Sequence, residues 1–509
     1  MKNFCKIAVL LALIIPSSFF FGKFYLQITN TLENNSKWIS TKMNLQKGVM
    51  GGVAYFITPV ALTENRLNLD PWFGYQEVLY RESLNPQEID FDLLLPEGSC
   101  FSFIYNKTPH QFSGFRLSRD PFYPNLYFVA EDEGRFLKKE SFETVNFKEI
   151  NQVKILFEKN QIFLYLNGKL LKSVQENLAS SFGMGFRGGV KPVSIDRVRI
   201  RLKKSDFILQ EDFQNKSAFL FSFLMSLGII LGINLLLYFK QNKEIFYSLL
   251  TLNGVVLVGS VIFYIAFFSY LSQNYYFEKY YFKTVSFLRQ YKSTIETKKK
   301  IIDRLRKTYP LEISSNAYPV LFVGTSQTWG AGATLEKDSF VHRLEEKFNQ
   351  ENHGGIHYEF INAGISGETA ARLWEPYQKE WIQWNPKIVI LNLSNNDQNS
   401  SEFSKYIEAY VKLNQEKGIP TVLILEANAR AQIKPHVGKN HQILRDLAKR
   451  HDLVLIDLHQ CLLEHDDSGF LWWDFVHPTS YGHELEADCI YPTLVEVIRK
   501  QNSSKENPF

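Results

Sequence analysis

Three uncharged or nearly uncharged runs of hydrophobic residues divide the chain. In residues 1–24, Lys2 and Lys6 precede the apolar stretch IAVLLALIIPSSFFFG, which is the charge pattern of a signal peptide or signal-anchor. The runs 218–239 and 246–271 contain no charged residue, and each is long enough to cross a hydrocarbon core of about 30 Å as a helix. We therefore predict an N-terminal signal-anchor or signal peptide and two transmembrane helices.

The connector between the second and third runs, residues 240–245, is short enough to make them a tight hairpin. The chain segments before and after this hairpin must then lie on the same face of the membrane. Basic residues beside the first run and in the connector favour the cytoplasm for both places, namely Lys2, Lys6, Lys240 and Lys243. Basic residues after the third run argue the opposite way, but the first span usually dominates. We predict that both large segments are extracytoplasmic.

Alternating short strands predict an all-β unit over residues 40–210. In VKILFEKNQIFLYLNGKLLKS, two alternating strands flank Lys159-Asn160, and the second ends at the hairpin signal Asn167-Gly168. Gly-rich turns then precede an alternating strand over Val193–Leu202. The pairing of FLYLNGKLL with a later GFRGG and SIDRVRI resembles concanavalin-like β-sandwich domains, which often bind glycans. A sandwich that binds nothing is an equally open interpretation.

Residues 272–312 form an aromatic and basic stalk, for which a helix near anionic headgroups and a solvated spacer helix are equally open. Beyond the stalk, five runs rich in Val, Ile and Leu alternate with helical stretches: YPVLFVG, HYEFINAG, KIVILNLS, TVLILEAN and LVLIDL. This pattern predicts an α/β three-layer domain over residues 315–500, in which helices cover both faces of a parallel sheet. Active sites of such folds lie at the carboxyl ends of the strands.

Composition excludes several classes of protein. With 509 residues, 45% hydrophobic and 22% charged, the chain is expected to form two to four folded units and is not an intrinsically disordered protein. The net charge of +4 gives no nucleic-acid-binding signal. Among the four cysteines there is no CxxC pair that would suggest zinc. Cys461 and Cys489 are candidates for a disulfide in an oxidising compartment, although we favour core or free thiols. We expect no metal and no cofactor.

Candidate chemistry follows the predicted strands. The first strand ends in Gly324-Thr325-Ser326, where a serine entering a helix lies beside free backbone N–H groups. The second ends in NAGISGET (362–369), whose glycines let backbone approach a substrate oxygen closely. The third ends in SNND (394–397), which offers side-chain amides. Near the C-terminus, Asp474 precedes His477 by three residues, a spacing that lets a carboxylate orient an imidazole.

Together, in this order, the four blocks resemble the SGNH (GDSL-type) serine hydrolase family over about residues 315–500. GTS stands where the family has GDS, NAGISGET is close to N-x-G-x-x-G-x-T, SNND stands for G-x-N-D, and DFVHPTSYGH matches D-x-x-H-P. Thr325 and Ser394 are the departures, and neither replaces a residue that does chemistry. The resemblance implies a flavodoxin-like sheet order and a serine esterase.

The resemblance also implies residue roles. Ser326 would attack an acyl carbonyl, His477 would take its proton, and Asp474 would fix the imidazole tautomer. The oxyanion hole would consist of the backbone N–H groups of Ser326 and Gly367 and the side-chain amide of Asn396. We interpret Asp457 as a residue that caps a helix or hydrogen-bonds a loop. We interpret a group of nearby polar residues as solvated loop residues: His459, His465, Asp466 and Asp467. Trp472 and Trp473 either line the acyl pocket or pack, and we favour packing.

The sequence thus predicts a membrane-anchored, extracytoplasmic serine esterase that hydrolyses acyl esters of an O-acylated glycan or a lipid. Two alternatives remain open: an acyltransferase that acts on surface polysaccharide with the same triad, and a non-enzymatic glycan-binding surface protein. The expected partners are the acyl-ester substrate and the membrane.

Overall fold

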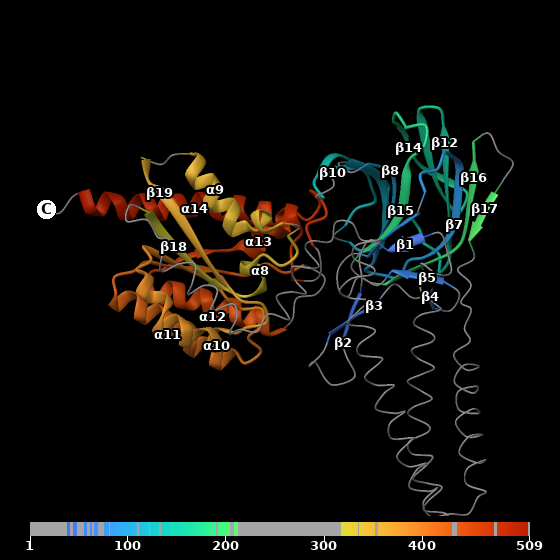
Figure 1. Cartoon of the computed structure of the whole chain (residues 1–509). Coiled ribbons are helices and arrows are strands. Elements are labelled where there is room, and N and C mark those ends of the chain that lie inside the picture. The colour runs from blue at the N-terminus through green and yellow to red at the C-terminus, as the bar shows by residue number, and fades with distance from the viewer. Residues whose placement is uncertain are drawn as a thin grey trace, which may run out of the picture.

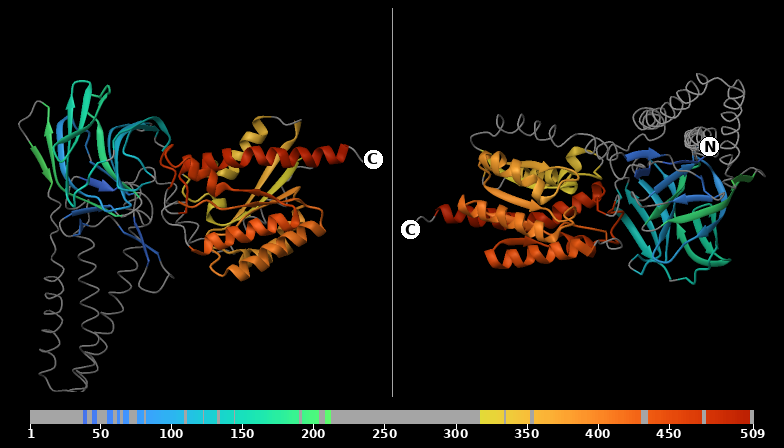
Figure 2. Two further views of the ribbon diagram at one scale, coloured as in Figure 1. Left: turned by 180° about the vertical axis from the view of Figure 1, so that it is seen from behind. Right: turned by 90° about the horizontal axis from the view of Figure 1, so that it is seen from below.

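The computed structural model describes residues 38–211 and 317–506, with gaps inside both ranges. The predicted signal-anchor (1–24), transmembrane helices (218–239 and 246–271) and stalk (272–312) lie outside the described residues. In the part of the chain that is described, no helix combines the length and the apolar character needed to cross a bilayer. The described residues form a β domain and an α/β domain that lie side by side (Figures 1 and 2).

The β domain consists of two antiparallel sheets and a separate hairpin of β2 (Asn44–Lys47) and β3 (Tyr55–Thr58). In spatial order, the seven-stranded sheet contains β1 (Trp38–Ser40), β6 (Gln76–Tyr80), β15 (Gly183–Gly189), β8 (Cys100–Lys107), β9 (Gln111–Ser118), β10 (Leu126–Glu131) and β11 (Phe136–Ser141). The eight-stranded sheet contains β14 (Lys169–Gln175), β13 (Gln161–Leu166), β12 (Asn151–Glu158), β7 (Pro86–Leu94), β16 (Val193–Leu202), β5 (Arg66–Leu69) and β4 (Leu62–Thr63), with β17 (Ile208–Glu211) beside β16.

Alternating side chains of the two sheets meet in one core, which makes this domain a β-sandwich. Phe91 of β7 contacts Phe101 and Phe186 of the opposite sheet, and Trp38 stacks on Phe186. The predicted hairpins are confirmed as β12–β13 and β13–β14, and Val193–Leu202 is a strand. The assignment to concanavalin-like domains stays a prediction.

The α/β domain has the predicted parallel sheet. Its order is β19 (His357–Gly364), β18 (Ala317–Gly324), β20 (Ile388–Asn392), β21 (Thr421–Ile424) and β22 (Val454–Ile456). This is the 2-1-3-4-5 order of flavodoxin-like folds, and its topological switch point lies between β18 and β20. The carboxyl ends of these two strands carry Ser326 and the Ser394–Asp397 segment.

Helices cover both faces of this sheet, as Figure 1 shows. One face packs against α9 (Phe340–Gln350), α13 (Leu458–Glu464) and α14 (Ser480–Glu506), and the other packs against α10 (Ala370–Lys379), α11 (Ser400–Glu416) and α12 (Pro435–His451). Alternate residues of β18 supply the two cores: Val320 and Phe322 face the first set, and Leu321 and Val323 face the second. Full coverage explains why β18, β20 and β21 are almost continuously hydrophobic and buried.

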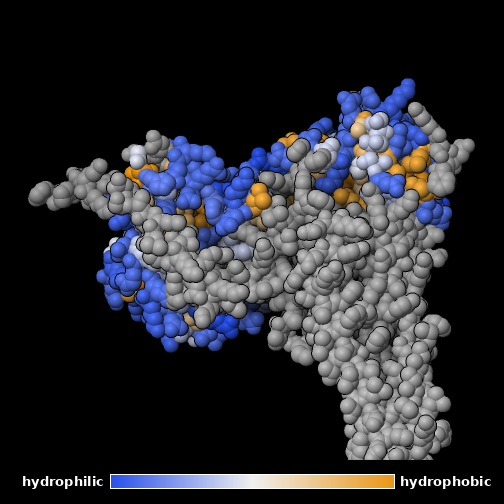
Figure 3. Space-filling model, in the orientation of Figure 1, coloured by the Kyte–Doolittle hydropathy of each residue, from blue (hydrophilic) through white to orange (hydrophobic). Residues whose placement is uncertain are grey.

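The two domains are joined through residues 468–470 of the α/β domain. The backbone N–H of Phe136 donates to the carbonyl of Ser468 at 3.0 Å, and that of Phe470 donates to the carbonyl of Gly134 at 2.8 Å. The ring of Phe470 packs against Phe112, Phe128 and Phe136 of the sandwich. Ion pairs of Arg135 with Glu484 and of Lys139 with Asp467 flank this contact. By contrast, the described surface visible in Figure 3 is mainly hydrophilic.

Candidate functional site

The nucleophile candidate and the base candidate meet at the carboxyl edge of the parallel sheet. β18 ends at Gly324, Thr325 is the N-cap, and Ser326 begins the short helix α8 (Ser326–Trp329). The Oγ of Ser326 lies 2.7 Å from Nε2 of His477, although 151 residues separate the two along the chain. Both side chains are buried, at 7% and 9% exposure. Asp474, the third predicted member, lies outside the described residues.

Two glycines allow the strands to approach the nucleophile turn. A Cβ on Gly324 would collide with the side chain of Thr328, and a Cβ on Gly364 would collide with the backbone of Trp329. The side-chain amide of Asn362 donates to the carbonyl of Thr328 at 2.7 Å. The end of β19 is therefore packed directly against α8, which holds Ser326 at a fixed place.

Two of the three predicted oxyanion donors, Gly367 and Asn396, belong to loops that are bonded to each other. Gly367 has φ +77°, a left-handed conformation that favours glycine. Glu368 follows Gly367, and its carbonyl accepts a hydrogen bond of 2.9 Å from the side-chain amide of Asn396. Asp397 accepts the backbone N–H of Ala370 at 3.0 Å, and burial raises the pKa of its carboxyl to about 6. These bonds hold Asn396 beside Gly367.

Glu426 was not among the predicted site residues, yet it bonds both the residue before Ser326 and the loop that carries Asn396. It follows β21 and has 0% exposure. Its carboxylate accepts the hydroxyls of Thr325 and Ser394 and the backbone N–H of Asn395, at 2.9, 3.0 and 2.6 Å. Burial raises its pKa to about 7. The available signal was a charged residue at the end of the otherwise apolar run TVLILEAN.

Gln327 is a second residue that sequence reasoning missed. Its side-chain amide donates to the carbonyl of Ala427 at 2.6 Å and to that of Val476, the residue before His477. The base of the His477 loop is closed separately, because the backbone N–H of Thr479 donates to the carbonyl of Leu471 and the Thr479 hydroxyl donates to that of Phe470. The loop carrying His477 is thus tied to the nucleophile turn and to the residue that docks on the sandwich.

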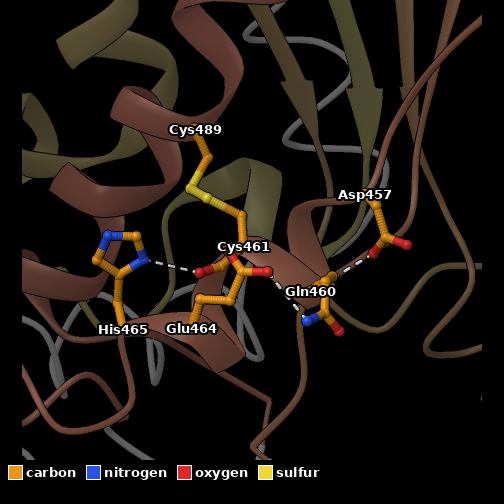
Figure 4. The surroundings of a disulfide bond; sticks show 6 residues. All are labelled: Asp457, Gln460, Cys461, Glu464, His465 and Cys489. Carbon is orange, nitrogen blue, oxygen red and sulfur yellow. Dashed lines mark hydrogen bonds between the residues drawn. A yellow bond between two sulfur atoms is a disulfide. The ribbon is translucent and has the colours of Figure 1, made fainter.

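Cys461 and Cys489 form a disulfide between α13 and α14, drawn in Figure 4. The preference for core or free thiols was therefore wrong, because sequence spacing does not reveal that these two helices pack against each other. The disulfide closes a segment with a sequence separation of 28 that includes positions 474 and 477. The helix before the His477 loop and the helix after it are cross-linked.

The remaining candidates have structural contacts. Asp457 caps α13 by accepting the N–H of Gln460 and pairs with Arg445, which confirms its interpretation as a cap. Nδ1 of His465 bonds the carbonyl of Cys461, a contact visible in Figure 4. Trp472 packs against the core and lies 3.4 Å from Asp466 through its indole N–H, whereas Trp473 lies outside the described residues.

Comparisons with known proteins concern the α/β domain. A search of curated proteins finds no match. Similar solved structures include an acetyl xylan esterase, AlAXEase (23% identity, covering 34% of this chain and 98% of that one, TM-score 0.31). The esterase EstA from Pseudoalteromonas sp. has 19% identity, covering 36% and 99%, with TM-score 0.31. A two-domain esterase active on acetylated mannans has 20% identity, covering 39% and 52%, also with TM-score 0.31.

A family model gives the sharper result. Residues 322–485 match the GDSL-like Lipase/Acylhydrolase family. The match begins inside β18 and ends inside α14, so it includes all four sequence blocks and the positions of Ser326 and His477. Residues 322–485 are therefore similar to the GDSL-like lipase/acylhydrolase family, and this match supports a serine hydrolase that acts on ester bonds.

Proposed function

We propose that this chain is a membrane-anchored, extracytoplasmic serine esterase that hydrolyses acyl esters of a glycan or a lipid. The observation that carries the catalytic part is the 2.7 Å contact between Ser326 Oγ and His477 Nε2. A serine hydroxyl within hydrogen-bond distance of an imidazole is the arrangement that activates a serine nucleophile. The family match supports the reaction class, because the matched range 322–485 includes both positions.

The proposed reaction has two halves. The Oγ of Ser326 attacks the acyl carbonyl while Nε2 of His477 takes the hydroxyl proton, and the resulting oxyanion is stabilised by the N–H groups of Ser326 and Gly367 and the amide of Asn396. His477 then gives its proton to the leaving alkoxide, which leaves an acyl-serine. Water then attacks the acyl carbonyl while His477 takes its proton, the bond between the carbonyl carbon and Oγ breaks, and His477 returns the proton to Oγ of Ser326 as the acid leaves. Asp474 would hold the imidazole in the required tautomer.

Two observations support a location outside the cytoplasm. Stable disulfides are typical of oxidising compartments, and Cys461 is joined to Cys489. The uncharged runs 218–239 and 246–271 favour anchoring by a helical hairpin that leaves both domains on one side. Protease added to sealed right-side-out vesicles should degrade both domains together. Protection of both domains there, with cleavage in inverted vesicles, would overturn the proposed orientation.

The catalytic proposal is tested with the full-length protein in detergent. A fluorophosphonate probe should label Ser326, and p-nitrophenyl esters of rising chain length should be hydrolysed. Ser326→Ala should remove both signals, whereas Ser401→Ala, an exposed serine on α11, should keep both. Labelling that survives Ser326→Ala would contradict the assignment, and absence of labelling and turnover in the wild type would favour a binding protein.

The substrate class requires a separate comparison. Acetylated polysaccharide and lysophospholipid vesicles are incubated with the wild type and with Ser326→Ala, and the free acid is measured. Release of free acid from the polysaccharide or from the lysophospholipid identifies the alcohol component of the ester as a sugar or a lipid. No release from either would overturn both proposed substrates. Transfer of the acyl group to an added sugar in preference to water would instead identify the acyltransferase.

A further inference from the structure

Glu426 connects two of the three segments that carry predicted oxyanion donors, namely those of Ser326 and Asn396. Thr325, which directly precedes Ser326, donates its hydroxyl to one carboxylate oxygen of Glu426 at 2.9 Å. Ser394 and the backbone N–H of Asn395, which directly precedes Asn396, donate to the other oxygen at 3.0 and 2.6 Å. One buried carboxylate thus bridges the end of β18 and the end of β20.

The two positions that depart from the SGNH motif pattern are the same two that supply hydroxyls to Glu426. Thr325 stands where GDS would place an aspartate, and Ser394 stands where a glycine would be. An aspartate at position 325 would place a second carboxyl group against the buried Glu426 in place of a hydroxyl donor, and a glycine at position 394 would remove one of its three donors. The threonine, the serine and the glutamate therefore form one mutually dependent set.

We infer that Glu426 is a positioning residue for ester hydrolysis: it sets the separation between the N–H of Ser326 and the amide of Asn396. The inference rests on the proposed function, because it concerns the same oxyanion hole. The carboxylate contacts the residues before the donors and does not itself touch the reacting atoms. Since a displacement of about 1 Å in an active site can cost about 100-fold in rate, a set of three hydrogen bonds at this point has a large effect on turnover.

The test compares Glu426→Ala with Glu426→Gln in the full-length chain. A glutamine keeps the shape, since its carbonyl oxygen can accept from Ser394 and Asn395 while its NH₂ donates to the hydroxyl of Thr325. We expect Glu426→Gln to keep kcat within about threefold, and Glu426→Ala to lose about 10- to 100-fold with KM within about twofold, because donors that act in the transition state are displaced. Each kcat is calculated per serine labelled to completion by a fluorophosphonate, so that unfolded protein is not counted.

Asn414→Ala is the matched control. Asn414 is also fully buried, and it bonds Tyr377 and Thr421 at the opposite end of β21. Its loss should lower the melting temperature but leave kcat per labelled serine unchanged. Thr325→Val, which removes a single donor, should lower kcat several-fold in the wild type and have no further effect in the Glu426→Ala background, because the bond is already absent there.

The outcomes separate this inference from the proposed function. A wild type without ester turnover would overturn both. If the wild type turns over ester, either of two results would overturn the positioning role alone. The first is a kcat of Glu426→Ala within threefold of the wild-type kcat. The second is an equal loss of kcat per labelled serine in Glu426→Ala and Asn414→Ala. Equal losses in Glu426→Gln and Glu426→Ala would also overturn it, because the hydrogen-bond geometry would then not be what matters. If Glu426→Ala does not fold, unchanged kcat in both Thr325→Val and Ser394→Ala would overturn the positioning role in its place.

Discussion

Ser326 and Asn396 differ in how much of the proposed reaction depends on them. Ser326→Ala removes the atom that attacks the ester, so we expect no measurable turnover. Asn396→Ala removes one of three oxyanion donors, which typically costs about 2.7–4 kcal/mol of barrier, or about 100- to 1,000-fold in kcat. The measurement is kcat on a p-nitrophenyl ester, with labelling of Ser326 to count active sites. Equal and negligible effects of the two changes would contradict the assignment.

Glu426 gives a residue-level prediction about stability and pH. Burial raises its pKa from 4.5 to about 7, so between these values the folded chain holds a proton that the unfolded chain releases. This group therefore lowers the free energy of unfolding as the pH rises from about 4.5 to about 7, by about 3 kcal/mol in total. Above about pH 7 its contribution no longer changes with pH. Glu426→Gln should remove this fall, as measured by melting temperature from pH 4.5 to 8.

The pKa of His441 is shifted in the opposite direction, so its effect on stability as the pH changes is opposite to that of Glu426. Burial lowers the pKa of its imidazole from 6.5 to about 4, so the unfolded chain takes up a proton first as the pH falls. Stability is then lost between pH 6.5 and about 4. The difference between wild type and Glu426→Gln at each pH isolates the carboxylate, because His441 is present in both. A difference that does not change with pH would contradict the raised pKa of Glu426.

At the scale of elements, the disulfide between α13 and α14 encloses the loop that carries His477. A cross-link over a sequence separation of 28 stabilises a fold by about 3–4 kcal/mol on the chain-entropy account. Reduction, or Cys461→Ser with Cys489→Ser, should lower the melting temperature of the α/β domain and raise the proteolytic sensitivity of residues 465–479. Unchanged melting temperature after complete reduction, verified by alkylation, would contradict this.

The elements were largely predictable from the sequence, whereas the contacts between them were not. The run KIVILNLS predicts β20 because a strand covered on both faces must be continuously apolar, and Asn167-Gly168 predicts a hairpin because both residues accept positive φ. The Ser326–His477 contact was reached only through the motif resemblance. Nothing local in TVLILEAN shows that Glu426 will meet Thr325 about 100 residues earlier, since that contact depends on sheet order.

At the scale of the whole molecule, Phe470 couples the sandwich to the His477 loop. Its ring contacts Phe128 of the sandwich, while its carbonyl accepts the hydroxyl of Thr479, two residues beyond His477. We expect Phe470→Ala to loosen the domain contact and to lower kcat on the order of 10-fold, because the base of the loop shifts. Limited proteolysis between the domains and kcat per labelled serine measure the two effects.

Phe348→Ala is the matched control for this prediction. Phe348 packs on Tyr358 and Phe360 inside the α/β domain, so its loss creates a cavity without touching the sandwich. This variant should melt at a lower temperature yet keep both the domain contact and kcat per labelled serine. Equal kcat in the two variants would mean that the sandwich has no influence on turnover.

The seating of Phe470 among sandwich aromatics also governs how the hydrolase region behaves once it is cut free. A fragment that begins near residue 315 would present this ring to water, together with the carbonyl of Ser468 and the N–H of Phe470 that bond the sandwich in the intact chain. Such a fragment should self-associate at concentrations where the intact chain stays dispersed. Expression of this fragment without the sandwich is thus expected to yield aggregates.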